Sequence, residues 1–218
     1  MRIEHDPTYR AIAHRGSYSI HFNALPSPKY DAFGIVDLTF GPNRFLHFAS
    51  SVTSLTGGGF INLGLAYKDH QIEGSLTLVA RNEYTLLDGF KRLDEPDRVG
   101  FSLEGRCRGE AHTYAASVGI GEDGVRVEES TSGLVNFKTL LVPYLRDPGP
   151  GTTTEVSIGE TIRLTHGGEE IEIVLGQGVC RVIHLPYGYE NRRGLCGLLR
   201  IDFEGAREGI SYRVRVVK

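Results

Sequence analysis

The sequence feature that most constrains this fold is the alternation of apolar and polar residues in short runs. In Ser17–Ala24, the apolar residues Tyr18, Ile20 and Phe22 alternate with polar ones. Successive side chains of a strand point to opposite faces, so a period of two is typical of a half-buried β-strand. The expected strands are Ser17–Ala24, Gly34–Phe40, Arg44–Ala49, Phe60–Tyr67, Gln71–Arg81, Val99–Glu104, Ala111–Ile120, Val125–Glu129, Leu134–Leu141, Thr161–Thr165, Glu170–Leu175, Val179–Leu185, Leu198–Phe203 and Ile210–Val217.

Turn residues separate these runs. The chain has 28 glycines, scattered without a period, and scattered glycine marks many turns between short strands. Asp123-Gly124 is expected to close a hairpin, and Asp147–Gly151 is expected to form a long loop. At most one turn of helix is expected, at Thr85–Arg92, and this excludes a βαβ arrangement. We predict one all-β domain over residues 1–218, a large antiparallel β-sandwich (supersandwich-like) with roughly 14–16 strands and almost no helix.

Composition excludes several classes of function. A net charge of −3 and a pI near 6.2 argue against general affinity for nucleic acid or anionic membranes. No apolar run is long enough to span a membrane as a helix. Three cysteines, none in a C-x-x-C pair, fit no common zinc site, and no phosphate-binding loop or nucleophile elbow occurs. We therefore expect no cofactor, no nucleic-acid partner and no membrane partner, and the sequence identifies no metal site.

The N-terminal segment, MRIEHDPTYR, does not have the pattern of a signal peptide. The localisation stays unknown at this point. The chain is expected to be either cytoplasmic or a piece excised from a secreted or periplasmic protein.

A histidine on the first expected strand is a candidate for catalysis. His21 alternates with Tyr18 and Phe22, so it shares the opposite face with Ser19 and Asn23. A histidine among small polar groups suits contact with sugar hydroxyls or proton transfer near pH 7. We predict His21 and Tyr18 as catalytic residues and Asn23 as a ligand contact. The alternative is an ordinary, partly exposed polar position on a strand.

Two further groups of residues are candidates for binding an acidic ligand. His14 and Arg15 precede Tyr18, and an arginine can hold a uronate or sulfate with two hydrogen bonds. The second group follows the expected strand Val179–Leu185, in a segment that we predict to be a loop. This loop combines aromatic, amide and guanidinium groups, namely Tyr187, Tyr189, Asn191 and Arg192. The alternatives are a solvated strand end and an ordinary polar loop.

Two pairs of adjacent carboxylates are poor candidates for glycoside hydrolysis. Glu128-Glu129 and Glu169-Glu170 lie on or next to expected strands. Adjacent residues of a strand point to opposite faces, so the two carboxylates of each pair cannot flank one glycosidic bond.

Two stretches resemble a known family. Arg15–Ser51 and Asp123–Gly149 are similar in order and style to the C-terminal β-sandwich of heparinase II/III-like polysaccharide lyases. In those enzymes an α/α-toroid precedes the sandwich and supplies much of the catalytic cleft. The resemblance implies a polysaccharide lyase accessory domain, with an α/α-toroid catalytic domain as a further partner. No position matches a catalytic motif specifically, so no residue role is carried over.

Three functional hypotheses follow. The first is a carbohydrate-associated sandwich that binds an acidic polysaccharide or oligosaccharide, or supports a lyase. The second is a stand-alone sugar-modifying enzyme, a lyase or isomerase, that uses a histidine and a tyrosine for proton transfer. The third is a structural module that docks on another domain through an apolar face.

Overall fold

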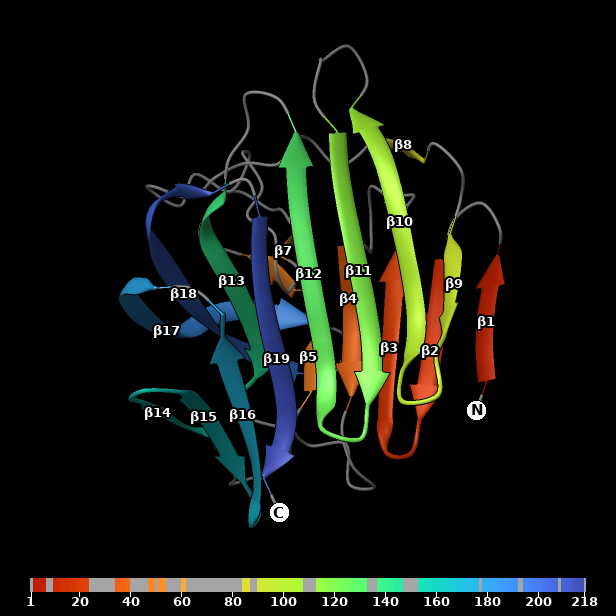
Figure 1. Ribbon diagram of the computed structural model, residues 1–218. Coiled ribbons are helices and arrows are strands. Elements are labelled where there is room, and N and C mark those ends of the chain that lie inside the picture. Colours follow the sequence, from red (N-terminus) through yellow and green to blue (C-terminus); the bar gives the residue numbers. More distant parts are fainter. Residues whose placement is uncertain are drawn as a thin grey trace.

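The computed structural model is all-β (Figure 1). In the part of the chain that it describes, nineteen strands and no helix are present, which confirms the predicted fold class. No helix there is long and apolar enough to cross a membrane. The described residues are 2–6, 10–23, 34–39, 47–49, 51–53, 60–61, 84–86, 90–107, 113–132, 137–146, 153–176, 178–191, 194–207 and 209–217.

One layer of the molecule is a nine-stranded antiparallel sheet. It carries more of the described core than either other sheet, because alternate residues along its long central strands are mostly apolar and buried. In spatial order its strands are β14 (Glu155–Ile158), β15 (Ile162–His166), β16 (Glu169–Leu175), β19 (Gly209–Val217), β12 (Gly124–Ser132), β11 (Thr113–Gly121), β10 (Val99–Cys107) and β8 (Tyr84–Leu86), with β9 (Lys91–Asp94) also paired to β10.

Two five-stranded antiparallel sheets lie behind this large sheet (Figure 1). The N-terminal sheet lies behind β10 to β12, and the other lies toward β16 and β19, with β5 packed beside β13. The N-terminal sheet has the order β1 (Arg2–Asp6), β2 (Arg10–Arg15), β3 (Tyr18–Asn23), β4 (Gly34–Thr39) and β5 (His47–Ala49). The other has the order β13 (Phe137–Leu145), β18 (Gly194–Arg207), β17 (Val179–Asn191), β6 (Ser51–Thr53) and β7 (Phe60–Ile61).

A single cluster of buried side chains combines residues from all three sheets. Three aromatic rings join the N-terminal sheet to the large one. Phe22, Phe90 and Phe101 contact one another edge to face, with ring centroids 5.6 to 6.1 Å apart. This geometry places the positive edge of one ring on the negative face of the next. The alternation seen in Ser17–Ala24 is therefore the mark of one strand face buried in a sandwich core.

Glycine closes the hairpins where the backbone turns left-handed. Gly167 and Gly168, between β15 and β16, have φ values of 58° and 84°, the positive pair that a type I′ turn requires. The hairpin predicted at Asp123-Gly124 is confirmed, because β11 and β12 pair down to Gly121 and Gly124. At Gly124 a Cβ atom would lie 2.4 Å from the carbonyl oxygen of Val214, so a side chain has no room.

Thr85–Arg92, where at most one helical turn is expected, contributes residues to β8 and β9, and residues 87–89 lie outside the described part of the chain. One local prediction is wrong. The segment that follows Leu185 is not a loop, since β17 continues to Asn191. Pro186 and Gly188 interrupt the pairing with β18, whose register shifts between Leu185 and Tyr189. A bulge thus absorbs residues that are typical of a loop.

Candidate functional site

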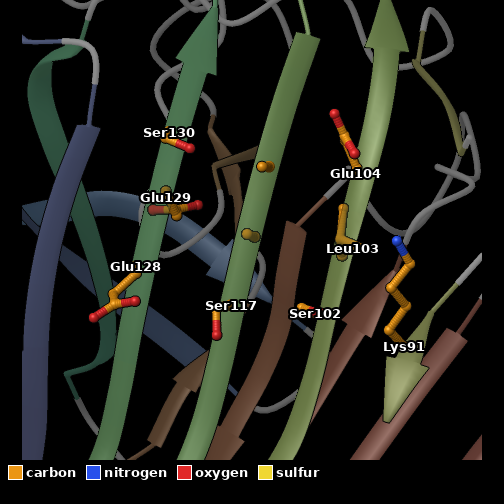
Figure 2. Close-up of a pocket in the computed structure, with 10 residues that line it drawn as sticks. Lys91, Ser102, Leu103, Glu104, Ser117, Glu128, Glu129 and Ser130 are labelled. Atoms are coloured by element: carbon orange, nitrogen blue, oxygen red, sulfur yellow. The ribbon is translucent and has the colours of Figure 1, made fainter. Parts of the chain in front are cut away.

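A hollow of about 440 Å³ lies on the outer face of the large sheet, over β10, β11 and β12 (Figure 2). Each strand contributes three consecutive residues, and the middle residue of each triplet is buried. The first and third residues point outward, because side chains alternate along a strand. The lining residues are Lys91 of β9, Ser102, Leu103 and Glu104 of β10, Ala115, Ala116 and Ser117 of β11, and Glu128, Glu129 and Ser130 of β12.

The outward side chains form two rows across the strands. Cross-strand pairing aligns Lys91, Ser102, Ser117 and Glu128 in one row. The next row runs from Glu104 through Ala115 to Ser130. The hollow exists because the outward residues of its centre are serine and alanine, while Lys91, Glu104 and Glu128 lie nearer its margins (Figure 2).

The chemistry of the hollow is that of a hydrogen-bonding surface. Serine hydroxyls both donate and accept, carboxylates accept, and the lysine ammonium donates. Glu128 is 46% exposed, and Arg126 makes an ion pair with it at 2.7 Å between Nη2 and Oε1. Two carboxylates and one ammonium line the outer surface, so an anionic ligand is the least suited to it.

The two adjacent carboxylates of β12 point to opposite faces, as predicted. Glu128 lies on the outer face, whereas Glu129 is 3% exposed and pairs with the buried residues Ala116 and Ile210. The neighbouring phenol of Tyr212 is also buried. Burial, together with the charge of Glu129, raises the pKa of Tyr212 well above its ordinary value of 10.0.

The structure separates the two residues predicted to act in catalysis. Tyr18 packs against the core, and its hydroxyl accepts a hydrogen bond from the backbone N–H of Val216, 3.3 Å away. His21 alternates with the buried residues Ile20 and Phe22, and is therefore on the opposite, outer face of β3. Tyr18 and His21 thus do not form a pair, although each residue faces the side that its position in the alternation predicts.

The structure does bring His21 together with His14. Their rings meet edge to face with centroids 6.1 Å apart, on the outer face of the β2–β3 hairpin. Arg15 is the cross-strand partner of Tyr18 at the end of that hairpin and is partly buried, so it lies on the other face of β2 from His14. The hairpin belongs to the layer opposite the hollow. The side chains of Asn23, Tyr187, Tyr189 and Asn191, and the whole of Arg192, lie outside the described residues.

A second histidine and tyrosine pair was missed by the sequence analysis. Tyr144 of β13 and His184 of β17 lie on either side of β18, and Tyr144 Oη is hydrogen-bonded to His184 Nε2 at 2.5 Å. The Tyr144 ring covers Gly197 of β18, where a Cβ atom would lie 2.4 Å from the ring. Burial lowers the pKa of His184 below its ordinary value of 6.5, so its imidazole is neutral at pH 7. No local signal marks this pair, because its members are 40 residues apart.

Comparisons with known proteins identified no relative of this chain. No protein-family model matches the chain, and a search of curated proteins found no match. The resemblance of Arg15–Ser51 and Asp123–Gly149 to heparinase II/III-like lyases therefore stays a prediction. Among the side chains that the structure describes, no group of three or more His, Cys, Asp or Glu residues is arranged to hold a metal ion.

Proposed function

We propose that this chain is a carbohydrate-binding β-sandwich that takes an oligosaccharide into the hollow over β10, β11 and β12. The observation that carries the proposal is the composition of this open hollow of about 440 Å³. Small side chains line its centre, and carboxylates and an ammonium lie at its margins. Its volume lies in the range of ordinary ligand sites. Hydroxyl-rich sugars match a surface that both donates and accepts hydrogen bonds.

The charge of the hollow favours a neutral glycan. Glu104 and Glu128 would repel a polyuronate, and Lys91 offsets only one of these charges. An acidic polysaccharide is instead the ligand predicted for Arg15, His14 and His21, which lie in the other layer, with Arg15 on the opposite face of β2 from His14. The two layers thus give two versions of the carbohydrate proposal, with different ligands and different residues.

Equilibrium binding to a panel of neutral and acidic polysaccharides tests the proposal. Ala115→Trp fills the floor of the hollow, and Glu104→Ala removes an acceptor at its margin. Each change is expected to weaken binding of a neutral glycan at least tenfold. Glu122→Ala is the control, because Glu122 is exposed in the turn of the same β11–β12 hairpin.

Two results would decide against the hollow. One is saturable binding of a neutral glycan that Ala115→Trp leaves unchanged. The other is binding of an acidic polysaccharide alone that is lost in Arg15→Ala and in His21→Ala. That result would place the binding site on the N-terminal sheet. It would favour a lyase-associated domain that accompanies an α/α-toroid.

The hydrogen bond between Tyr144 and His184 favours one second candidate, a sugar lyase or isomerase. A neutral imidazole can accept a proton, and a hydrogen-bonded phenol can donate one. The bond lies where a buried ring meets an exposed imidazole, so one end of the pair is accessible. The competing explanation is structural, since the bond also links β13 to β17 across β18.

Formation of unsaturated products, followed by ultraviolet absorbance, tests the enzymatic candidate. Tyr144→Phe and His184→Ala should each reduce turnover at least a hundredfold while the protein still binds glycan. Product formation that is equal in both variants, or absent for every polysaccharide that the protein binds, would leave the hydrogen bond with its structural role only.

A docking module is the third alternative. The exposed large apolar side chains of the described residues are Ile158, on the edge strand β14, and Val217, at the end of β19. They are separated in the register, because Ile158 aligns with Ile162 and Val217 with Glu170. Two separate side chains do not make the wide apolar patch that such a module uses.

A further inference from the structure

From the outer face of the β2–β3 hairpin, we infer that His14 and His21 together bind a divalent transition-metal ion of the zinc class. The two residues lie diagonally across neighbouring antiparallel strands, since His14 pairs with Ser19 and His21 with Ile12. The observation is their ring contact, with centroids 6.1 Å apart. This inference is independent of the glycan site, because it concerns the opposite layer.

The geometry suits a shared ion. A zinc–nitrogen bond is about 2.0–2.1 Å long, so two imidazoles bound to one ion at tetrahedral angles have ring centroids roughly 5 Å apart. The observed separation of 6.1 Å is somewhat larger, and rotation of the two side chains can close the difference. The rings are nearly perpendicular, at 84°, and both side chains are only partly buried, so they can turn their nitrogens toward a common point.

The surroundings agree with a metal site that solvent can reach. Ala11, Ala13, Ile20 and Phe22 fill the inner face of this hairpin and hold its two strands against the core. Water can complete the coordination of a zinc ion that two imidazoles hold.

Titration of the full chain with Zn²⁺ alone, followed by calorimetry, tests the inference. His14→Ala and His21→Ala are each expected to lower the affinity for Zn²⁺ at least tenfold, and the double variant should behave like either single one. The matched control is His184→Ala, which also removes one imidazole that solvent reaches but lies in a different sheet. Ser17→Ala, in the turn of the same hairpin, controls for local changes.

A second measurement separates this pair from the other histidines. Cu²⁺ added below one equivalent should broaden the imidazole NMR signals of His14 and His21 before those of His184. The inference is wrong if His14→Ala and His21→Ala bind Zn²⁺ as the wild type does, or if His184→Ala loses as much affinity as they do. Thermal unfolding verifies that each variant is folded, which is expected because both side chains lie on an outer face.

Discussion

Glu172 and Glu129 lie on β16 and β12, the two strands that flank β19, and they are 4% and 3% exposed. They are equally buried, but on opposite faces of the sheet. Glu172 alternates with Ile171 and Ile173, which pack in the core, so its carboxylate lies on the outer face. Glu129 lies on the inner face, between the layers.

The outer carboxylate is surrounded by donors. Thr161 Oγ1 donates to Glu172 Oε1 at 2.8 Å, and Arg215 Nε donates to Oε2 at 2.7 Å. Arg163 lies farther away, at 3.5 Å. The pKa of Glu172 is lowered from its ordinary 4.5, first by the Thr161 hydrogen bond and then by Arg215, and these effects exceed the cost of desolvation.

The inner carboxylate differs at one of its two oxygens. Glu129 keeps other interactions in the fold, but its Oε2 receives no hydrogen bond from the described residues, and neither does the hydroxyl of Tyr212. The charge of Glu129 and the burial of Tyr212 both hold that phenol in its protonated form. Two carboxylates that are equally buried are therefore expected to contribute differently to stability, according to the hydrogen bonds that each oxygen receives.

The largest expected effect is that of Glu172→Gln. Replacing the carboxylate weakens the charge-assisted hydrogen bonds from Thr161 and Arg215, so the free energy of unfolding should fall by about 1–2 kcal/mol. Urea unfolding at pH 7 measures it. Glu160→Gln, at an exposed bend before β15, is the control and should change little. Equal stability of the two variants would mean that solvent screens the arginines, so that their interactions with Glu172 do not stabilise the fold.

The next effect is on stability in acid. Because the folded pKa of Glu172 is lower than its ordinary 4.5, its stabilisation is fully present above that value and disappears as the pH falls through the folded pKa. The wild type should therefore lose about 1 kcal/mol more than Glu172→Gln between pH 6 and the acid end of the titration, at about pH 2. Parallel stability curves for the two proteins would contradict this assignment.

Glu129→Gln is expected to have a smaller effect of the opposite sign. An amide of nearly the same shape is easier to bury than a carboxylate, so the free energy of unfolding at pH 7 should rise by up to about 1 kcal/mol. The same urea experiment measures it. A loss as large as that of Glu172→Gln would show that the inner carboxylate is held as strongly as the outer one, and the comparison would fail.

The smallest effect is expected for Tyr212→Phe. No described group hydrogen-bonds to the Tyr212 hydroxyl, so its removal should change stability at pH 7 by less than about 0.5 kcal/mol. At alkaline pH the two proteins should differ. The unfolded phenol ionises near 10.0 while the folded one stays protonated, so wild-type stability falls as the pH rises above 10.0. Above pH 10.0 the free energy of unfolding should therefore change less with pH in Tyr212→Phe than in the wild type, as measured by unfolding followed by circular dichroism.

Local pattern alone predicted a substantial part of this molecule. The alternation in Ser17–Ala24 identified the buried face of β3, and Asp123-Gly124 identified a hairpin. The opposite directions of Glu128 and Glu129 also followed from the pleat of a strand. Each of these features depends on residues that are neighbours along the chain, where backbone geometry sets the direction of the side chains.

Features that depend on pairing between distant segments were not predictable in this way. Pro186 and Gly188 are typical of a loop, yet the pairing of Leu185 and Tyr189 with β18 on either side of them keeps β17 continuous. The hollow combines residues of four strands, and only the register of those strands aligns Ser102 with Ser117. Tyr144 meets His184 across an intervening strand.

The amino-acid pattern was enough to predict an antiparallel all-β protein and the core-facing side of Ser17–Ala24, because a period of two is a local property of the extended backbone. The tertiary structure alone decided which outward residues meet. Shifting one strand by two residues would preserve every buried face and still separate Glu104 from Ser130, or His14 from His21. The candidate sites of this protein are therefore properties of strand register, which no single segment of its sequence contains.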